Sequence, residues 1–149
     1  MKIGWTVVAA VAALAGAAHA EPAAWPSDLK QALQGKWVAE RNARAIEIVG
    51  DQVFIRNSSQ FNDTYYGPVG SVMATVGSED SARASDYHRY FTGTCINAST
   101  SFQPSRCTSY VNQPPGPKKF MMLEINGDRY WREEDMSAWG KEHRMRKDP

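Results

Sequence analysis

The sequence predicts an all-β protein: a small antiparallel β-barrel of about eight strands with a short N-terminal helix, following a cleaved signal peptide. The first 20 residues have the pattern of a secretory signal. After Trp37, short alternating segments rich in β-branched and aromatic residues are separated by turn residues. The chain beyond the signal has the size of one domain, and a sheet this small hides its edges most readily by closing.

Residues 1–20 are interpreted as the signal peptide. Lys2 precedes an apolar run from Val7 to Ala18, and Ala18-His19-Ala20 offers a small-x-small cleavage site. The run is shorter than the about 20 apolar residues that a membrane span needs. We therefore expect a secreted or periplasmic protein, with residues 21–149 as a single barrel domain and no membrane span after cleavage. The alternative is an uncleaved anchor.

Charge and composition argue against two classes of partner. The whole chain has 17 Lys and Arg and 16 Asp and Glu, and loss of Lys2 with the signal balances them. A neutral chain without a basic stripe argues against nucleic-acid binding and against electrostatic docking to a membrane.

Cys95 and Cys107 are the only cysteines. In an exported chain such a pair predicts a disulfide. Its loop of about a dozen residues would contribute roughly 3 kcal/mol of stability. A metal pair or a catalytic thiol is the alternative, but no histidine or further cysteine lies nearby in the sequence.

The first element after the signal is a helix, expected at residues 27–35. Ser27 is expected to cap its amino end, and Gly35 to end it in the left-handed conformation. Two hairpins are expected, at residues 45–56 and 119–134. Between them, further strands are expected at 71–76, 86–96 and 106–112, separated by 77–85, 99–105 and 112–118. Val72, Ala74 and Val76 alternate and are expected on one face. Residues 135–149 are expected to form a frayed tail.

The first hairpin is expected around the turn at residues 50–51. Pairing across two residues places Ile48 opposite Val53 and Ile46 opposite Ile55. All four aliphatic side chains then share one face. A slip of one residue would expose them all, so the register is strongly specified.

The second hairpin is expected at Asn126-Gly127, a dipeptide that favours a type I′ turn. Met122 then faces Trp131 and Leu123 faces Tyr130. The hairpin carries apolar residues on both faces, which indicates cover on both sides.

Leu33-Gln34-Gly35-Lys36-Trp37 resembles the Gly-x-Trp motif that opens the barrels of the calycins, which include lipocalins, avidins and small bacterial metalloprotease inhibitors. The resemblance implies structural roles for Gly35 and Trp37, with Trp37 plugging one end of the barrel. It also implies a late cation over Trp37, supplied by Arg132 or Arg144. The alternative is that Trp37 is an ordinary core residue.

No arrangement of residues predicts a catalytic site, a metal site or a cofactor. The alternative is a histidine-based hydrolase or nuclease using His88, which would need His143 in the charged tail to fold onto the central strand. Glu133 and Glu134 are adjacent and point to opposite faces of a strand, so they do not form a catalytic pair. Nucleophile-elbow, phosphate-loop and His-Glu-x-x-His motifs are absent from the sequence.

Aromatic residues are the candidates for binding. Tyr65 and Tyr66 lie in a turn-rich segment, where rigid aromatic side chains make good recognition anchors. Tyr87, Tyr90 and Trp131 are further candidates. In a sheet protein the alternative for each is packing.

The expected function is that of an exported, non-catalytic binding protein. It would act by protein recognition or enzyme inhibition, or by binding a small apolar ligand. The alternatives are a small secreted hydrolase or nuclease using His88, and a structural protein of the cell envelope or of stress.

Overall fold

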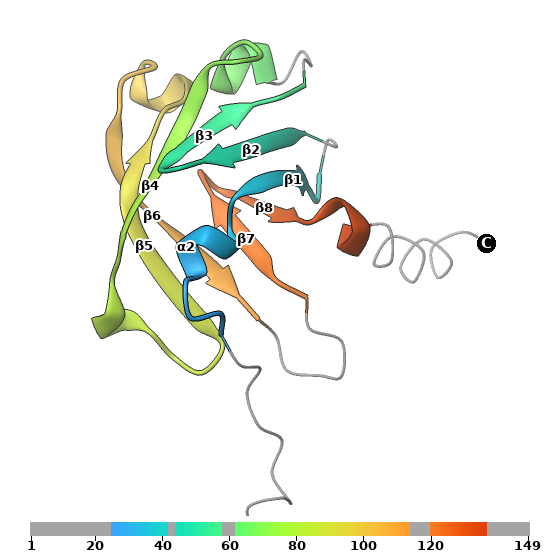
Figure 1. The fold of residues 1–149 in the computed structure, drawn as a ribbon. Helices are drawn as coiled ribbons and strands as arrows, with labels where there is room; N and C mark the ends of the chain where they lie inside the picture. The colour runs from blue at the N-terminus through green and yellow to red at the C-terminus, as the bar shows by residue number, and fades with distance from the viewer. Residues whose placement is uncertain (1–24, 42–43, 58–61, 114–119, 137–149) are drawn as a thin grey trace, which may run out of the picture.

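The computed structural model describes residues 25–41, 44–57, 62–113 and 120–136, and within them the chain forms a closed antiparallel barrel of eight strands (Figure 1). Each strand pairs with its neighbours in the chain, and β8 pairs with β1. The predicted fold class is therefore confirmed. The elements are α2 (Leu29–Ala32), β1 (Gly35–Ala39), β2 (Ala45–Val49), β3 (Gln52–Ile55), η1 (Asn62–Tyr66), β4 (Val72–Glu79), η2 (Ser81–Arg83), β5 (His88–Cys95), η3 (Ala98–Thr100), β6 (Ser105–Asn112), β7 (Met122–Ile125) and β8 (Asp128–Trp131).

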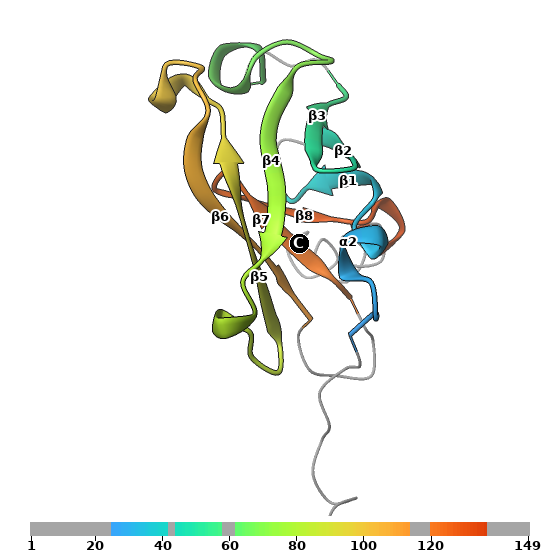
Figure 2. The same cartoon turned by 60° about the vertical axis from the view of Figure 1, so that its left-hand side comes forward.

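The two ends of the barrel are built differently. At the end that we call the helix end, α2 lies against the β2–β3 turn, where Lys30 pairs with Asp51 at 2.7 Å. At the other end, which we call the loop end, η1 and η3 lie against each other, and both views of the fold show them together (Figures 1 and 2). The β7–β8 turn also lies at the loop end, where the Asn97 side chain donates a hydrogen bond to the Asn126 side chain.

Side chains fill the barrel. The inward-facing residues include bulky aliphatic and aromatic side chains with no solvent exposure: Trp37, Ile46, Val53, Ile55, Met73, Val76, Val111, Leu123, Ile125 and Tyr130. Burial of each large apolar side chain contributes about 1.5–3 kcal/mol, so this interior is the main source of stability.

Both predicted hairpins are confirmed in turn position and register, although the second is shorter than expected: β7 begins at Met122 and β8 ends at Trp131, while residue 119 lies outside the described residues. Ile48 pairs with Val53 and Ile46 with Ile55, and all four are buried. In the second hairpin Leu123 pairs with Tyr130, and Asn126 and Gly127 have φ of 53° and 85°, as a type I′ turn requires. Met122, Leu123, Tyr130 and Trp131 are all buried, so the hairpin is covered on both faces as expected.

The N-terminal helix is shorter than predicted, and its cap is a different residue. α2 covers only Leu29–Ala32, and the side chain of Asp28, rather than that of Ser27, accepts the bond from the Gln31 backbone N–H at 3.1 Å. Both residue types can cap a helix, so the sequence does not distinguish two neighbouring candidates. Gly35 has the expected positive φ, 104°, but it begins β1 rather than ending the helix, whose C-cap is Leu33.

Strand β4 differs most from the prediction. The register shifts between Val53 and Phe54, so that Val72 pairs with Phe54 and Met73 is fully buried in its place. The strand also continues through Gly77, which was expected in a separator. A Cβ on Gly77 would lie 2.6 Å from the Thr92 carbonyl oxygen, so the absence of a side chain allows β4 to pass close to β5.

The predicted disulfide between Cys95 and Cys107 is present and joins β5 to β6. Several expectations lie outside the described residues: the signal peptide at 1–20, the connector from residue 114 to 118, and the tail beyond residue 136. Within the described ranges, no helix is long and apolar enough to cross a membrane.

Candidate functional site

The helix end of the barrel is closed by Trp37 and Arg132. The Trp37 ring is fully buried, and its Nε1 donates to the Leu33 carbonyl at 2.9 Å. The Arg132 guanidinium lies 4.1 Å from the centre of that ring. It donates to the backbone carbonyls of Ala32 (2.6 Å), Gln34 (2.9 Å) and Lys36 (3.1 Å). Of the two candidate cations, Arg132 therefore lies over Trp37, whereas Arg144 is outside the described residues.

The loop end is closed by a buried polar cluster that we call the loop-end cluster: Arg44, Tyr66, Asp128 and Tyr130. Arg44 is fully buried, and its Nη2 forms an ion pair with Asp128 Oδ2. The Tyr66 hydroxyl donates to the same carboxylate oxygen at 2.6 Å. The Arg44 guanidinium lies 4.5 Å from the centre of the Tyr66 ring and 5.8 Å from that of Tyr130.

The environment of the loop-end cluster sets its protonation. Burial raises the pKa of Tyr130 to about 12. Burial, together with the hydrogen bond to Asp128, raises the pKa of Tyr66 far above its usual value. Burial works against the charge of Arg44, but its contacts with Tyr130, Tyr66 and Asp128 outweigh burial and raise its pKa. At neutral pH both phenols stay protonated and the guanidinium stays charged, an arrangement suited to holding structure rather than to transferring protons.

Amide side chains tie the surrounding loops to this cluster. Asn126 Nδ2 donates to the carbonyls of Met73 and Ile96, each at 3.2 Å. Asn97 Nδ2 donates to Asn126 Oδ1 at 2.6 Å, and the Tyr66 hydroxyl also reaches the Asn126 carbonyl at 3.0 Å. The β7–β8 turn, the η1 loop and the η3 loop are thus held as one unit.

An apolar pocket of about 460 Å³ opens between the η1 and η3 loops. Its lining residues are Tyr66, Gly67, Pro68, Ser71, Val72, Ile96 and Phe102. Phe102 is 46% exposed, and Val69, which follows the lining residue Pro68 in the chain, is 47% exposed. Tyr66 belongs both to the pocket wall and to the loop-end cluster, so the buried network fixes one wall of the pocket.

The backbone around the apolar pocket has two uncommon features. Residues 62–66 form a single π-helical turn. Ser101 and Phe102 both adopt the left-handed conformation, with φ of 55° and 58°, directly after η3. Reciprocal bonds between Asn97 and Thr100 hold η3 in place. Left-handed non-glycine residues and π-helical turns are enriched at functional sites.

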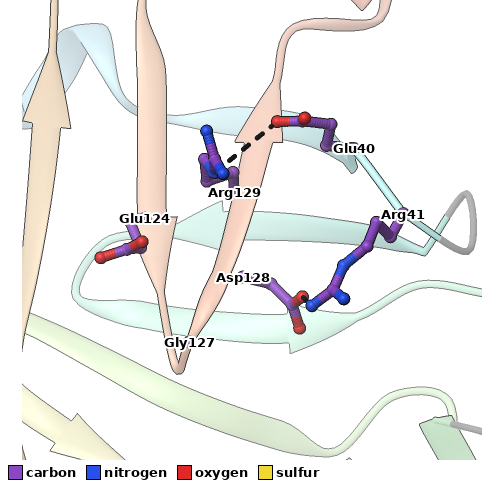
Figure 3. A pocket seen from close by; sticks show the side chains of 6 residues that line it. All are labelled: Glu40, Arg41, Glu124, Gly127, Asp128 and Arg129. Atoms are coloured by element: carbon purple, nitrogen blue, oxygen red, sulfur yellow. Dashed lines mark ion pairs between the residues drawn. The ribbon is translucent and has the colours of Figure 1, made fainter.

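A second, polar pocket of about 320 Å³ adjoins the β7–β8 turn. Figure 3 shows Arg129 turned toward Glu40 and Asp128 turned toward Arg41. The nitrogen–oxygen distances of these pairs are 3.8 Å and 3.5 Å. Because acidic and basic groups pair with each other here, the pocket has no marked net charge to select a ligand.

The predicted binding residues form separate groups. Tyr65 and Tyr66 lie at the loop end, with ring centres 4.8 Å apart. Tyr90 lies on the outer face of β5, where its ring centre is 5.7 Å from that of Tyr110. Trp131 is nearly buried on the outer face of β8, and its Nε1 donates to Glu40 at 3.3 Å.

Tyr87 and His88 lie at the start of β5, toward the helix end. Tyr87 is half-buried, and its carbonyl accepts a bond from the Gln113 backbone N–H at 3.0 Å. His88 Nδ1 lies 3.4 Å from the Ser85 hydroxyl. Tyr65, Tyr66 and His88 therefore do not meet at one opening, and the catalytic role of His88 stays a prediction.

Three residues of the loop end were not singled out in the sequence: Arg44, Asp128 and Phe102. The hairpin register contained a clue to Asp128, since it shares a face with Tyr130, and a carboxylate on a buried face needs a partner. Nothing local identifies that partner as Arg44, which lies 84 positions away in the chain. The left-handed conformation of Phe102 has no sequence signal, because phenylalanine rarely adopts it.

Within the described ranges, no group of three or more histidine, cysteine, aspartate or glutamate residues is placed to hold a metal ion. Comparisons with protein-family models, curated proteins and solved structures find no match for this chain.

Proposed function

We propose that this protein is an exported binding module whose loop end holds an apolar side chain of a partner protein in the pocket between the η1 and η3 loops. The observation that carries the proposal is the position of Phe102: a large apolar side chain, about half exposed, in a left-handed conformation at the rim of an apolar pocket. Exposing such a residue costs free energy that a binding partner would recover.

The filled interior favours this function over carriage of a small ligand inside the barrel. The core side chains occupy the space between Trp37 at the helix end and the loop-end cluster. The apolar pocket lies outside the strands, among loops. Loops on a rigid scaffold are a common location for recognition.

The closed sheet also restricts how a partner can bind. Each described strand has a neighbour on both sides, so no whole edge strand is offered to a partner; β6 pairs with β7 only over residues 110–112, which leaves a short stretch of β6 without a β7 partner. Recognition then depends on side chains and loops. One apolar side chain in the pocket would contribute about 1.5–3 kcal/mol, the usual yield of burying a Leu, Ile or Phe.

The family and the compartment belong to the same proposal. We infer a calycin-like barrel from Gly35 and Trp37 at the start of β1, and the stacking of Arg132 on Trp37 supports it. Export is inferred from the pattern of residues 1–20, and a disulfide suits an oxidising compartment.

A peptide-display experiment tests the proposed function. A phage-displayed library of random peptides would be selected on the disulfide-bonded protein, and affinities measured by titration. We expect enriched peptides to share a Leu, Ile, Phe or Trp anchor. Phe102→Ser should weaken binding about tenfold or more, equivalent to about 1.4 kcal/mol. The matched control is Val49→Ser, since Val49 is 49% exposed but lies at the helix end, and it should leave affinity unchanged.

Two results would contradict the proposal. One is a selection that enriches no apolar anchor. The other is enriched peptides whose affinity changes neither in Phe102→Ser nor in Val69→Ser. Both residues are exposed, so these variants should fold normally, and a loss of binding would report on the pocket in Phe102→Ser and on the loop next to it in Val69→Ser.

A further inference from the structure

The outer face of strands β4–β6 is a surface that the proposed function does not use. Along β5 the outward-facing residues are His88, Tyr90, Thr92 and Thr94, because side chains alternate between faces. Their cross-strand partners on β6 are Asn112, Tyr110, Thr108 and Arg106. One end of this face is therefore aromatic, and the other carries hydroxyl groups and a guanidinium.

We propose that this outer face binds a neutral oligosaccharide. A sugar ring has an apolar C–H face that packs on aromatic rings and a rim of hydroxyls that need hydrogen-bond partners. The two halves of the face supply these two kinds of contact in one line along β5.

The aromatic half is a contiguous group of rings. Tyr90 and Tyr110 are directly opposite in the sheet, with ring centres 5.7 Å apart. The His88 ring lies 6.3 Å from Tyr90 and 6.1 Å from Tyr110. All three side chains are only partly buried, so part of each ring remains accessible. Arg83, which is exposed, lies 4.3 Å from the centre of the Tyr90 ring and adds a planar donor at the edge of the group.

The polar half is a groove of about 510 Å³. It is lined by Gly77, Ser78, Thr92, Gly93, Thr94 and Arg106. The two glycines let β4 and β5 approach closely at the groove, since a Cβ at either position would collide with a backbone carbonyl of the neighbouring strand. The Thr92, Ser78 and Arg106 side chains are exposed at its walls. Thr92 follows Tyr90 by two residues, about 7 Å along a strand, so groove and rings are continuous.

Other classes of ligand fit this face less well. A peptide that extended the sheet would pair with the backbone edge of β6 at residues 105–109, where β6 has no β7 partner, and would leave the outer face unused. A nucleic acid would require a basic stripe, whereas the chain as a whole has a net charge of +1. A membrane would require a broad apolar area, and the exposed large apolar residues among those described, Val49, Val69 and Phe102, all lie elsewhere.

The test uses three soluble sugars as probes: chitohexaose, cellohexaose and maltohexaose. Binding to the disulfide-bonded protein would be measured by titration calorimetry up to millimolar concentration. We expect at least one of the three to bind. Tyr110→Ala should weaken that binding about tenfold, equivalent to about 1.4 kcal/mol, through loss of the ring. Arg106→Ala and Thr92→Val change exposed groove residues without affecting the core and should also weaken it.

The peptide-binding proposal and the oligosaccharide proposal can be refuted independently, because they depend on different residues. Phe102→Ser should leave sugar affinity unchanged, and Tyr110→Ala should leave the affinity for displayed peptides unchanged. The oligosaccharide proposal is overturned if none of the three sugars binds. It is equally overturned if binding persists in both Arg106→Ala and the double variant Tyr90→Ala, Tyr110→Ala.

Discussion

The two ends of the barrel each hold an arginine over an aromatic ring, but they complete its bonds in different ways. At the helix end, Arg132 lies 4.1 Å from the Trp37 ring centre and donates to backbone carbonyls. At the loop end, Arg44 lies 4.5 Å from the Tyr66 ring centre and pairs with the Asp128 carboxylate. Backbone carbonyls are present whatever the side chains are, whereas the bonds of Arg44 depend on particular residues from distant parts of the chain.

The bonding partners of Arg132 lie in one local segment of the chain, whereas those of Arg44 lie in distant segments. The carbonyls that hold Arg132 come from residues 32–36, a single local segment that leads into β1. The partners of Arg44 come from η1 and β8, and Asn126 extends the network to β4 and the η3 loop. The helix end therefore closes the barrel, while the loop end closes it and also positions the loops that frame the apolar pocket.

Arg44→Met tests this comparison with the largest expected effect. The variant leaves the Asp128 carboxylate buried without its internal cation, and breaking a buried pair in this way costs about 3–5 kcal/mol. The free energy of unfolding would be measured by urea titration. The double variant Arg44→Met, Asp128→Leu should lose less than the single one, because it removes both charges. A single variant that loses less than about 1 kcal/mol would contradict the account.

Much of the fold could be predicted because local rules decide it. Two-residue turns set the register of both hairpins. Because Ile46 and Ile48 alternate along the first hairpin, only one of its faces can be the buried one. The path of β4 was not predicted correctly, because its bulge and the two close-packed glycines depend on contacts with the backbones of the neighbouring strands.

The candidate site was only partly predictable. Tyr65 and Tyr66 were singled out from their turn-rich context, and Tyr66 does line the apolar pocket. Arg44 and Asp128 meet only after the barrel closes, since their separation of 84 positions carries no local pattern. Either Arg132 or Arg144 was expected over Trp37, and the structure places Arg132 there, a contact between residues far apart in the chain.

Arg132→Met should have a smaller effect than Arg44→Met, because no buried carboxylate is stranded. The loss of a stacked guanidinium and of hydrogen bonds to carbonyls is expected to cost about 1–3 kcal/mol in urea unfolding. Affinity for displayed peptides should be unchanged, since the loop end keeps its network. Weaker peptide binding in an Arg132→Met variant that remains folded would contradict the claim that only the loop end positions the pocket.

The pH dependence of stability separates the ends in another way. Because the Tyr130 pKa is about 12 in the folded protein against 10.0 for an ordinary tyrosine, the unfolded chain loses this proton first as pH rises. The contribution is complete below pH 10 and is lost between pH 10 and 12. The free energy of unfolding, obtained from thermal unfolding curves, should fall more between pH 10 and 12 in the native protein than in Tyr130→Phe. The expected difference is on the order of 2 kcal/mol. Equal slopes would show that Tyr130 is not held in its protonated form.

Arg41→Ala is expected to have the smallest effect. Arg41 also faces Asp128, at 3.5 Å, but its side chain is 78% exposed. An exposed ion pair contributes about 0–1 kcal/mol, because water and salt screen it. A loss as large as that of Arg44→Met would mean that the carboxylate depends on its outer partner rather than on its buried one.

The measurement that tests the central claim most directly is an amide NMR titration with the apolar probe N-phenyl-1-naphthylamine. If the loop end is the binding end, the perturbed amides should gather around Tyr66, Ile96 and Phe102, and Phe102→Ser should abolish the shifts. Perturbation centred instead on the barrel interior, at Ile48, Val76 and Val111, would show that the protein takes ligands inside its barrel and would contradict the account.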